Sequence, residues 1–167
     1  MGYIRKKSLQ YEMQDISWYI QKLESFCAFR ERCSSEIVSK LKELGADDDK
    51  IEIVTAHLLE NNFFDDARFA HAFARGKHRL KKWGKEKIIR ELKIRQINHD
   101  LIQEAVKGIE EENYGDVLYT MLKKKSDMLS RTNKENIKQK LINFAYQKGY
   151  SYSDIEKTLQ LLLNQNG

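Results

Sequence analysis

Residues 65–95 read DDARFAHAFARGKHRLKKWGKEKIIRELKIR. The stretch opens with two carboxylates, Asp65 and Asp66, followed by a segment with the spacing of an aromatic helix. Between Arg75 and Arg95 there are ten Lys or Arg residues against two Glu, a formal excess of +8, whereas the whole chain carries +5. The segments before and after this stretch resemble modified copies of it, so it forms the middle unit of a repeat.

The chain contains three related units, whose matching positions recur at offsets of 51 and then 53 residues. These positions are Ile37, Leu41, Gly45 and Ile51 in the first unit, Ile88, Leu92, Gln96 and Ile102 in the second, and Leu141, Ala145, Gly149 and Ile155 in the third. Self-similarity at a fixed period indicates a repeat architecture. We therefore predict repeats at 12–62, 63–111 and 112–165, each with room for three helices.

Composition and periodicity favour helices throughout. The chain has no proline and only eight glycines, although strand-and-turn folds use both residues at their corners. Apolar residues follow the i, i+4, i+7 spacing of a helix face, as at Ile37, Leu41 and Leu44. The pattern predicts nine helices, near residues 12–31, 34–44, 47–61, 64–80, 84–95, 98–110, 113–130, 133–147 and 151–165.

The repeats are expected to stack on one another. Each has too few apolar positions for a core of its own, so each must bury its apolar face against the next. We predict an all-α fold in which three tandem three-helix repeats form an elongated, curved array. Gly45 and Gly149 can take the left-handed conformation at a helix end. At Gln96, either the turn differs or the residue bears strain of about 1 kcal/mol.

The composition also narrows the class of protein. No apolar run approaches the roughly 18 residues of a membrane span, and the basic N-terminus lacks the apolar core of a signal peptide. Cys27 and Cys33 have the spacing of neither a zinc knuckle nor a redox pair, so we expect free thiols in a reducing cytosol. The sequence pI of 9.1 suggests an acidic partner.

The cations after Arg75 fall on one side of two consecutive predicted helices. We define a cationic stripe by the candidate binding residues Arg75, Lys77, Arg79, Lys81, Lys82, Lys85 and Arg90. Such a stripe can follow a phosphate backbone or an acidic groove in a protein. The alternative is a solvated helix face whose cations pair with Glu86 and Glu91. Trp83, at the junction, either stacks on a base or partner or packs between the two helices.

No constellation of residues predicts catalysis. The histidines are His57, His71, His78 and His99, and none has the spacing of a metal site. The pair Asp65 and Asp66 is better explained as a helix cap than as catalytic carboxylates, because adjacent helical residues point in different directions. We therefore expect no enzymatic activity, no metal and no cofactor.

The order of several motifs resembles the signature of the RecX family. Residues 63–70 (FFDDARFA) and 83–92 (WGKEKIIREL) are similar to its Leu/Phe-Asp-Asp-x-x-Phe/Tyr-Ala and Gly-x-x-x-Ile-x-x-Glu-Leu steps. Residues 30–34 (RERCS) and 148–152 (KGYSY) resemble its Arg-x-Arg-Ser and Arg-Gly-Phe-Ser-Tyr steps. The matched signature positions, to which the resemblance gives a structural role, are Asp65, Asp66, Phe69, Gly84, Ile88 and Leu92. The chain departs from the family at Gln96, where glycine is usual.

The resemblance implies a small cytoplasmic bacterial protein that regulates the recombinase RecA in DNA recombination, DNA repair and the SOS response. Family members settle into the helical groove of RecA filaments on DNA. They inhibit ATP hydrolysis, strand exchange and coprotease activity, mostly by promoting net filament loss. We expect a monomer without membrane attachment whose partner is the RecA nucleoprotein filament, with direct contact to single- or double-stranded DNA left open. The alternative is a stand-alone nucleic-acid-binding helical module that uses the cationic stripe.

Overall fold

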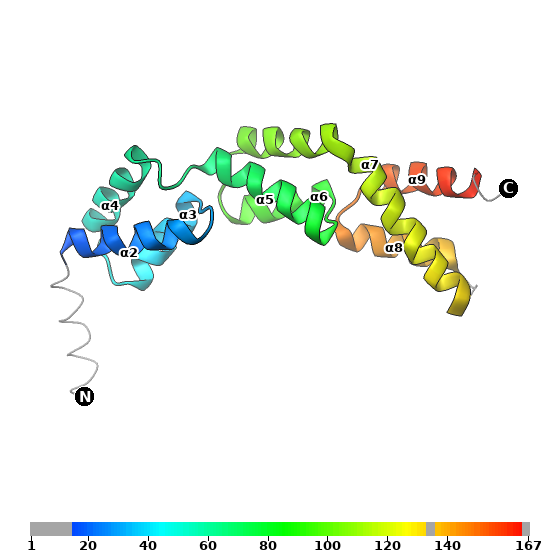
Figure 1. Cartoon of the computed structure of the whole chain (residues 1–167), viewed down its shortest axis with the longest axis horizontal. Coiled ribbons are helices and arrows are strands. Elements are labelled where there is room, and N and C mark those ends of the chain that lie inside the picture. Colours follow the sequence, from blue (N-terminus) through cyan, green and yellow to red (C-terminus); the bar gives the residue numbers. More distant parts are fainter. Residues whose placement is uncertain (1–14, 133–135, 165–167) are drawn as a thin grey trace, which may run out of the picture. The chain divides into compact units, whose positions relative to one another are not determined.

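The computed structural model describes residues 15–132 and 136–164, and every regular element in this part of the chain is a helix (Figure 1). The helices are α2 (Ile16–Phe29), α3 (Ser34–Glu43), α4 (Asp48–Glu60), α5 (Asp66–Lys81), α6 (Lys85–Ile94), α7 (His99–Thr132), α8 (Ile137–Lys148) and α9 (Tyr152–Asn164). The all-α prediction is confirmed. The outer limits of the predicted repeats and the ends of the helices predicted at 12–31, 133–147 and 151–165 fall partly outside the described residues.

The long helix α7 contains a break. Inside its 34 residues, Asn113 has φ −170° and ψ 37°, which interrupts the helical backbone. The two halves on either side of Asn113 correspond to the helices predicted at 98–110 and 113–130. Each of the nine predicted helices therefore has a counterpart among the described residues, and two of them are joined in α7.

The backbone divides into two compact units, the first of which runs through Phe69 and includes the short segment Arg95–Ile97. Inside it, α2, α3 and α4 pack on one another. They enclose a buried cluster made of Tyr19, Leu23, Cys27, Ile37, Leu41, Val54, Leu58 and Phe64. The expectation that no repeat has a core of its own is wrong for the first repeat, because α2 adds an aromatic ring and a thiol to the aliphatic positions.

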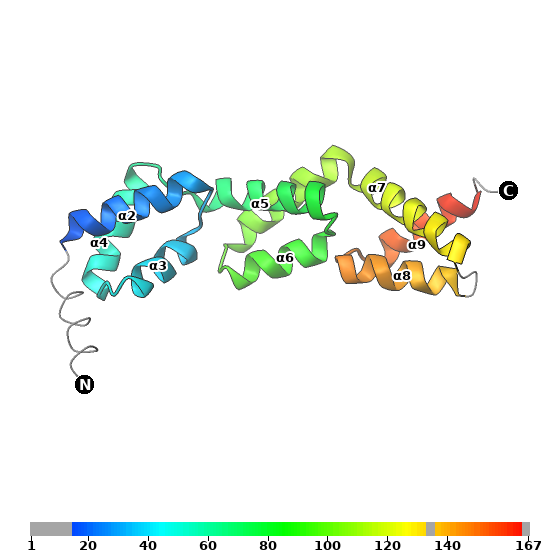
Figure 2. The ribbon, with the colours of Figure 1, turned by 60° about the horizontal axis from the view of Figure 1, so that its bottom comes forward.

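The second unit contains Ala70–Ile94 and the chain from Asn98 onward. In it, α7 packs against α6, α8 and α9, and α8 packs against α9. Figure 2 shows the start of α6 beside the end of α8. Most of the predicted second repeat therefore lies in this unit together with the predicted third repeat, while the predicted repeat boundaries and the curvature of the array stay predictions.

The turns after α3, α6 and α8 each contain a residue with left-handed backbone conformation at the equivalent position. Gly45 has φ 84°, Gly149 has φ 90° and Gln96 has φ 59°. The turn at Gln96 is therefore of the same type as the glycine turns, and Gln96 bears the strain that an L-residue meets in this conformation.

Candidate binding groove

The start of α6 is held by the turn between α8 and α9. The backbone N–H of Gly84 donates to the carbonyl oxygen of Lys148 at 2.8 Å, and that of Glu86 donates to Gly149 O at 3.0 Å. The intervening N–H, of Lys85, donates to Tyr114 Oη at 3.1 Å. The N–H groups at a helix start have no partner inside the helix, so these three bonds fix α6 against the following repeat.

We call this contact between the start of α6 and the α8–α9 turn the α6 joint. Gly84 is required there because two backbone segments approach each other closely. A Cβ atom on Gly84 would lie 2.3 Å from Gly149 O and 2.5 Å from Tyr150 N. A Cβ on Gly149 would lie 2.3 Å from the Cβ of Lys87. Only residues without a side chain allow the two segments to come this close.

The first unit contains a comparable joint at the start of α3. The N–H and the hydroxyl of Ser34 donate to the Asp66 carboxylate at 2.7 and 2.8 Å, and Ser35 Oγ donates to the carbonyl oxygen of Arg95 at 2.7 Å. Asp65 has a different part, because it accepts from the N–H of Arg68 at 2.7 Å and caps the start of α5. The two adjacent carboxylates thus support two different helices.

Three aromatic rings lie in contact behind the α6 joint, with His78 stacked on Tyr114 and Tyr114 tilted against Tyr150. The His78 and Tyr114 ring centroids are 5.2 Å apart, and so are those of Tyr114 and Tyr150. His78 is fully buried, with Nδ1 2.9 Å from the carbonyl oxygen of Trp83. Burial raises the pKa of Tyr150 far above its ordinary value, with a smaller contribution from Asp154. These rings make the joint a packed, water-poor contact.

The cationic stripe is divided by the structure into several environments. On α5, Arg75 and Arg79 are exposed and both pair with Glu112, at 3.4 and 2.9 Å. Lys81 and Lys82 are exposed at the end of the same helix.

Two other stripe lysines lie against aromatic rings instead. Lys77 Nζ lies 5.1 Å from the centre of the Trp83 ring, which also has Lys87 Nζ at 4.5 Å and Phe73 edge-on at 6.4 Å. Trp83 is thus half-buried among these groups. Lys85 belongs to the joint, since its Nζ lies 5.0 Å above the Tyr114 ring and 3.9 Å from Asp154.

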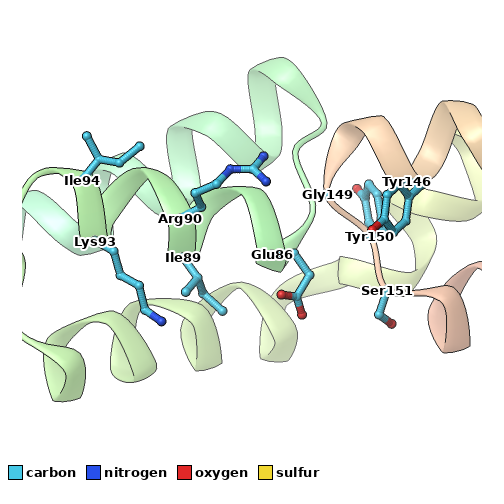
Figure 3. Close-up of a pocket in the computed structure, with 9 residues that line it drawn as sticks. All are labelled: Glu86, Ile89, Arg90, Lys93, Ile94, Tyr146, Gly149, Tyr150 and Ser151. Carbon is cyan, nitrogen blue, oxygen red and sulfur yellow. The ribbon is translucent and has the colours of Figure 1, made fainter.

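Arg90 lies elsewhere, in a groove between α6 and the α8–α9 turn (Figure 3). The groove has a volume of about 810 Å³. It is lined by Glu86, Ile89, Arg90, Lys93 and Ile94 from α6, and by Tyr146, Gly149, Tyr150 and Ser151 from the turn and its flanks. Two apolar side chains in it are largely solvent-exposed, Ile94 at 67% and Tyr146 at 68%. The groove therefore combines two cations with exposed apolar surface.

Sequence reasoning missed most of this groove. A usable signal was present in α6, where Ile88 and Leu92 are buried but Ile89 and Ile94 fall off that face. Apolar residues outside the core face of a helix indicate a second contact surface. Among the other residues that match the family signature, Phe69 is also buried, with 3% of its surface exposed.

The described residues contain no metal-binding cluster and no membrane-spanning helix. No group of three or more His, Cys, Asp or Glu side chains there could hold a metal ion. Cys27 and Cys33 are both buried and free, and burial raises the pKa of the Cys27 thiol. None of the described helices is both long and apolar enough to cross a bilayer.

These features define an all-helical repeat protein with an exposed cationic surface and a groove of mixed character. Sequence comparison makes the class specific. Residues 65–106 match the second three-helix domain of RecX, and residues 112–159 match its third three-helix domain. The chain belongs to the RecX family. The resemblance and the prediction of tandem three-helix repeats are both confirmed.

Individual relatives agree with this assignment. The regulatory protein RecX of Clostridium acetobutylicum is 32% identical over 146 residues, covering 85% of this chain and 67% of the relative. The regulatory protein RecX of Clostridium botulinum (strain Alaska E43 / Type E3) is 30% identical over 135 residues. This match covers 80% of the present chain but only 63% of the length of that relative. The crystal structure of RecX from Lactobacillus salivarius is similar in fold, with a TM-score of 0.79 at 20% identity over 88% of this chain and 96% of that one.

Proposed function

We propose that this chain binds RecA filaments on DNA and inhibits RecA's ATP hydrolysis, strand exchange and coprotease activity by promoting net filament loss. The observation that carries the proposal is membership of the RecX family, whose relatives are named regulatory proteins. In this proposal the chain acts as a monomer in the cytoplasm and catalyses no chemical step itself. Its role would then lie in recombination, DNA repair and the SOS response.

The exposed cations support a footprint on an acidic surface. Lys81, Lys82 and Arg90 are exposed and form no ion pair with another described residue. A cation without an internal partner gives up little when it meets an external carboxylate or phosphate. Arg75 and Arg79 would first have to leave Glu112, so they contribute less. Binding through such contacts is salt-sensitive, because exposed charges are screened over about 8–10 Å at physiological ionic strength.

The proposal is tested by following a fluorescently labelled chain on RecA filaments assembled on single-stranded DNA at low salt. Arg90→Glu should weaken filament binding by about three- to tenfold, the range expected for reversing one exposed charge. Lys42→Glu is the matched control, since Lys42 is an exposed cation on α3 outside the stripe. A wild-type chain that ignores the filaments would remove this function.

A second candidate function is a stand-alone nucleic-acid-binding module, favoured by the exposed cations Arg79, Lys81 and Lys82. Reversing these three charges should weaken binding to single-stranded DNA and reduce its salt dependence. Each lost phosphate contact lowers the slope of log K against log salt concentration by about 0.7. Lys85 is left in place, because it packs at the joint. An unchanged slope would exclude these three cations from the DNA footprint.

A further inference from the structure

A second groove runs along the C-terminal half of α7, and Phe144 of α8 and Lys82 of the α5–α6 turn also line it. Its volume is about 620 Å³. The α7 residues that line it, from Asn113 to Met128, recur every three or four positions, so they form one continuous face of the helix. At a rise of about 1.5 Å per residue, this face is roughly 22 Å long. It is long enough to accept a helix of four turns.

The floor of the groove is apolar and adaptable. Val117, Met121 and Phe144 are partly exposed there, and Met128 is 56% exposed. Methionine side chains have three rotatable bonds and a polarizable sulfur, so they adjust to the side chains of different partners. A groove with two methionines in its floor is suited to the apolar face of another helix.

The rim of the groove is basic. Lys82, Lys124 and Lys125 line it against one carboxylate, Asp116. Lys82 and Lys124 are exposed, and neither forms an ion pair with another described residue. The groove therefore has a net positive charge that is not neutralised from within the described chain, and charge complementarity points to an acidic partner.

The side chains that line the groove favour a helix over a nucleic acid. Single-stranded nucleic acids bind where bases can stack on aromatic rings. Phe144 is the one aromatic side chain among the described residues of this groove, and the Lys125 ammonium already lies 5.2 Å from its centre. A helix with an apolar stripe can cover the floor while its acidic flanks meet the rim.

We propose that the α7–α8 groove binds an acidic amphipathic helix of a partner protein. The apolar stripe of that helix would cover Val117 and Met121, and its carboxylates would pair with Lys82 and Lys124. This docking site goes beyond the proposed regulation of RecA and does not depend on it.

The test uses two labelled synthetic peptides of about 15 residues, the length that matches the groove. One peptide carries leucines along a single helical face with Glu and Ala elsewhere. The other has the same composition in shuffled order, without an apolar face. Fluorescence anisotropy with the full chain should show the amphipathic peptide binding at least about tenfold more tightly, and binding should weaken as salt is added. Equal binding of the two peptides would overturn the proposal.

Two substitutions place the binding in the groove. Thr120 is exposed on the α7 face that lines the groove, one residue before Met121. Thr120→Trp should therefore block the floor and weaken peptide binding at least about tenfold, while Thr120→Ala should not. Lys124→Glu should weaken it about three- to tenfold, and Lys42→Glu should not. Wild-type affinity in both Thr120→Trp and Lys124→Glu would contradict the proposal. So would displacement of the peptide by an equally charged single-stranded DNA at equal concentration, because the site would then be a general polyanion surface.

Discussion

The joint between α6 and the α8–α9 turn predicts a large effect for the smallest possible substitution. Gly84→Ala adds one methyl group, and its nearest neighbours would be backbone atoms of Gly149 and Tyr150 at 2.3–2.5 Å. Backbone cannot rotate away as a flexible side chain can, so the two segments must separate. Overpacking of this kind costs about 1–3 kcal/mol, and the loss of the bonds to Lys148 O and Gly149 O adds about 1 kcal/mol each. We expect a total of about 3–5 kcal/mol.

Unfolding by urea and by heat measures this change. Trp83 fluorescence in a Trp18→Phe background reports on the second unit, and each 1 kcal/mol lowers Tm by about 2–4 °C in a chain of this size. Gly84→Ala should therefore lower Tm by about 6–20 °C. Gly76→Ala is the matched control, because Gly76 lies inside α5 with nothing within 4 Å of its added Cβ. It should stabilise the chain by about 0.5–1 kcal/mol. If Gly84→Ala behaved like this control, the backbones at Gly84 and Gly149 would not approach each other this closely in the folded chain.

Three further substitutions test other contacts. Gln96→Gly should stabilise the chain by about 1 kcal/mol in urea unfolding, because Gln96 has φ 59°; a loss of stability would mean that the left-handed turn is not strained. Tyr150→Phe should be neutral or stabilising by up to about 1 kcal/mol, since the buried Oη has no hydrogen-bond partner among the described residues. Burial raises the pKa of Tyr150, so the wild type should lose stability as pH rises above about 10. In a series of thermal melts, Tyr150→Phe should lose less stability over the same pH range. Equal loss in both proteins would exclude Tyr150 as the cause. Asp66→Ala should cost about 2 kcal/mol, since two donors on Ser34 lose their acceptor, whereas Asp65→Ala loses one cap bond and should cost about 1 kcal/mol; the opposite order in urea unfolding would contradict these assignments.

The helices could be predicted from sequence because their signals are local. Ile37 and Leu41, or Ile88 and Leu92, lie on one face by spacing alone, and each pair is buried. The interruption of the helical backbone near Asn113 in α7 was also predicted from the sequence. The repeat offset, again a property of the linear sequence, matched Gln96 to Gly45 and Gly149, but it left open whether the turn at Gln96 differs from the glycine turns or is strained.

The candidate site was harder to predict, because its geometry joins residues far apart in the chain. Gly84 matched a motif, but its contact with Gly149 becomes visible only once α6 lies against the α8–α9 turn. The cationic stripe was treated as one surface, yet Glu112 pairs with Arg79 on α5, and Lys85 packs at the joint. Charge and spacing identify candidate cations, whereas the division among free, paired and packed cations depends on the tertiary structure.

The proposed regulation of RecA can be measured through RecA's single-stranded-DNA-dependent ATPase activity. The chain is titrated well below one molecule per RecA, with Arg90→Glu and Lys42→Glu in parallel. If the chain regulates RecA, we expect inhibition at this low ratio, weakened by Arg90→Glu and unchanged by Lys42→Glu. Inhibition only when the chain is in excess and coats the DNA, or no inhibition at any ratio, would contradict it.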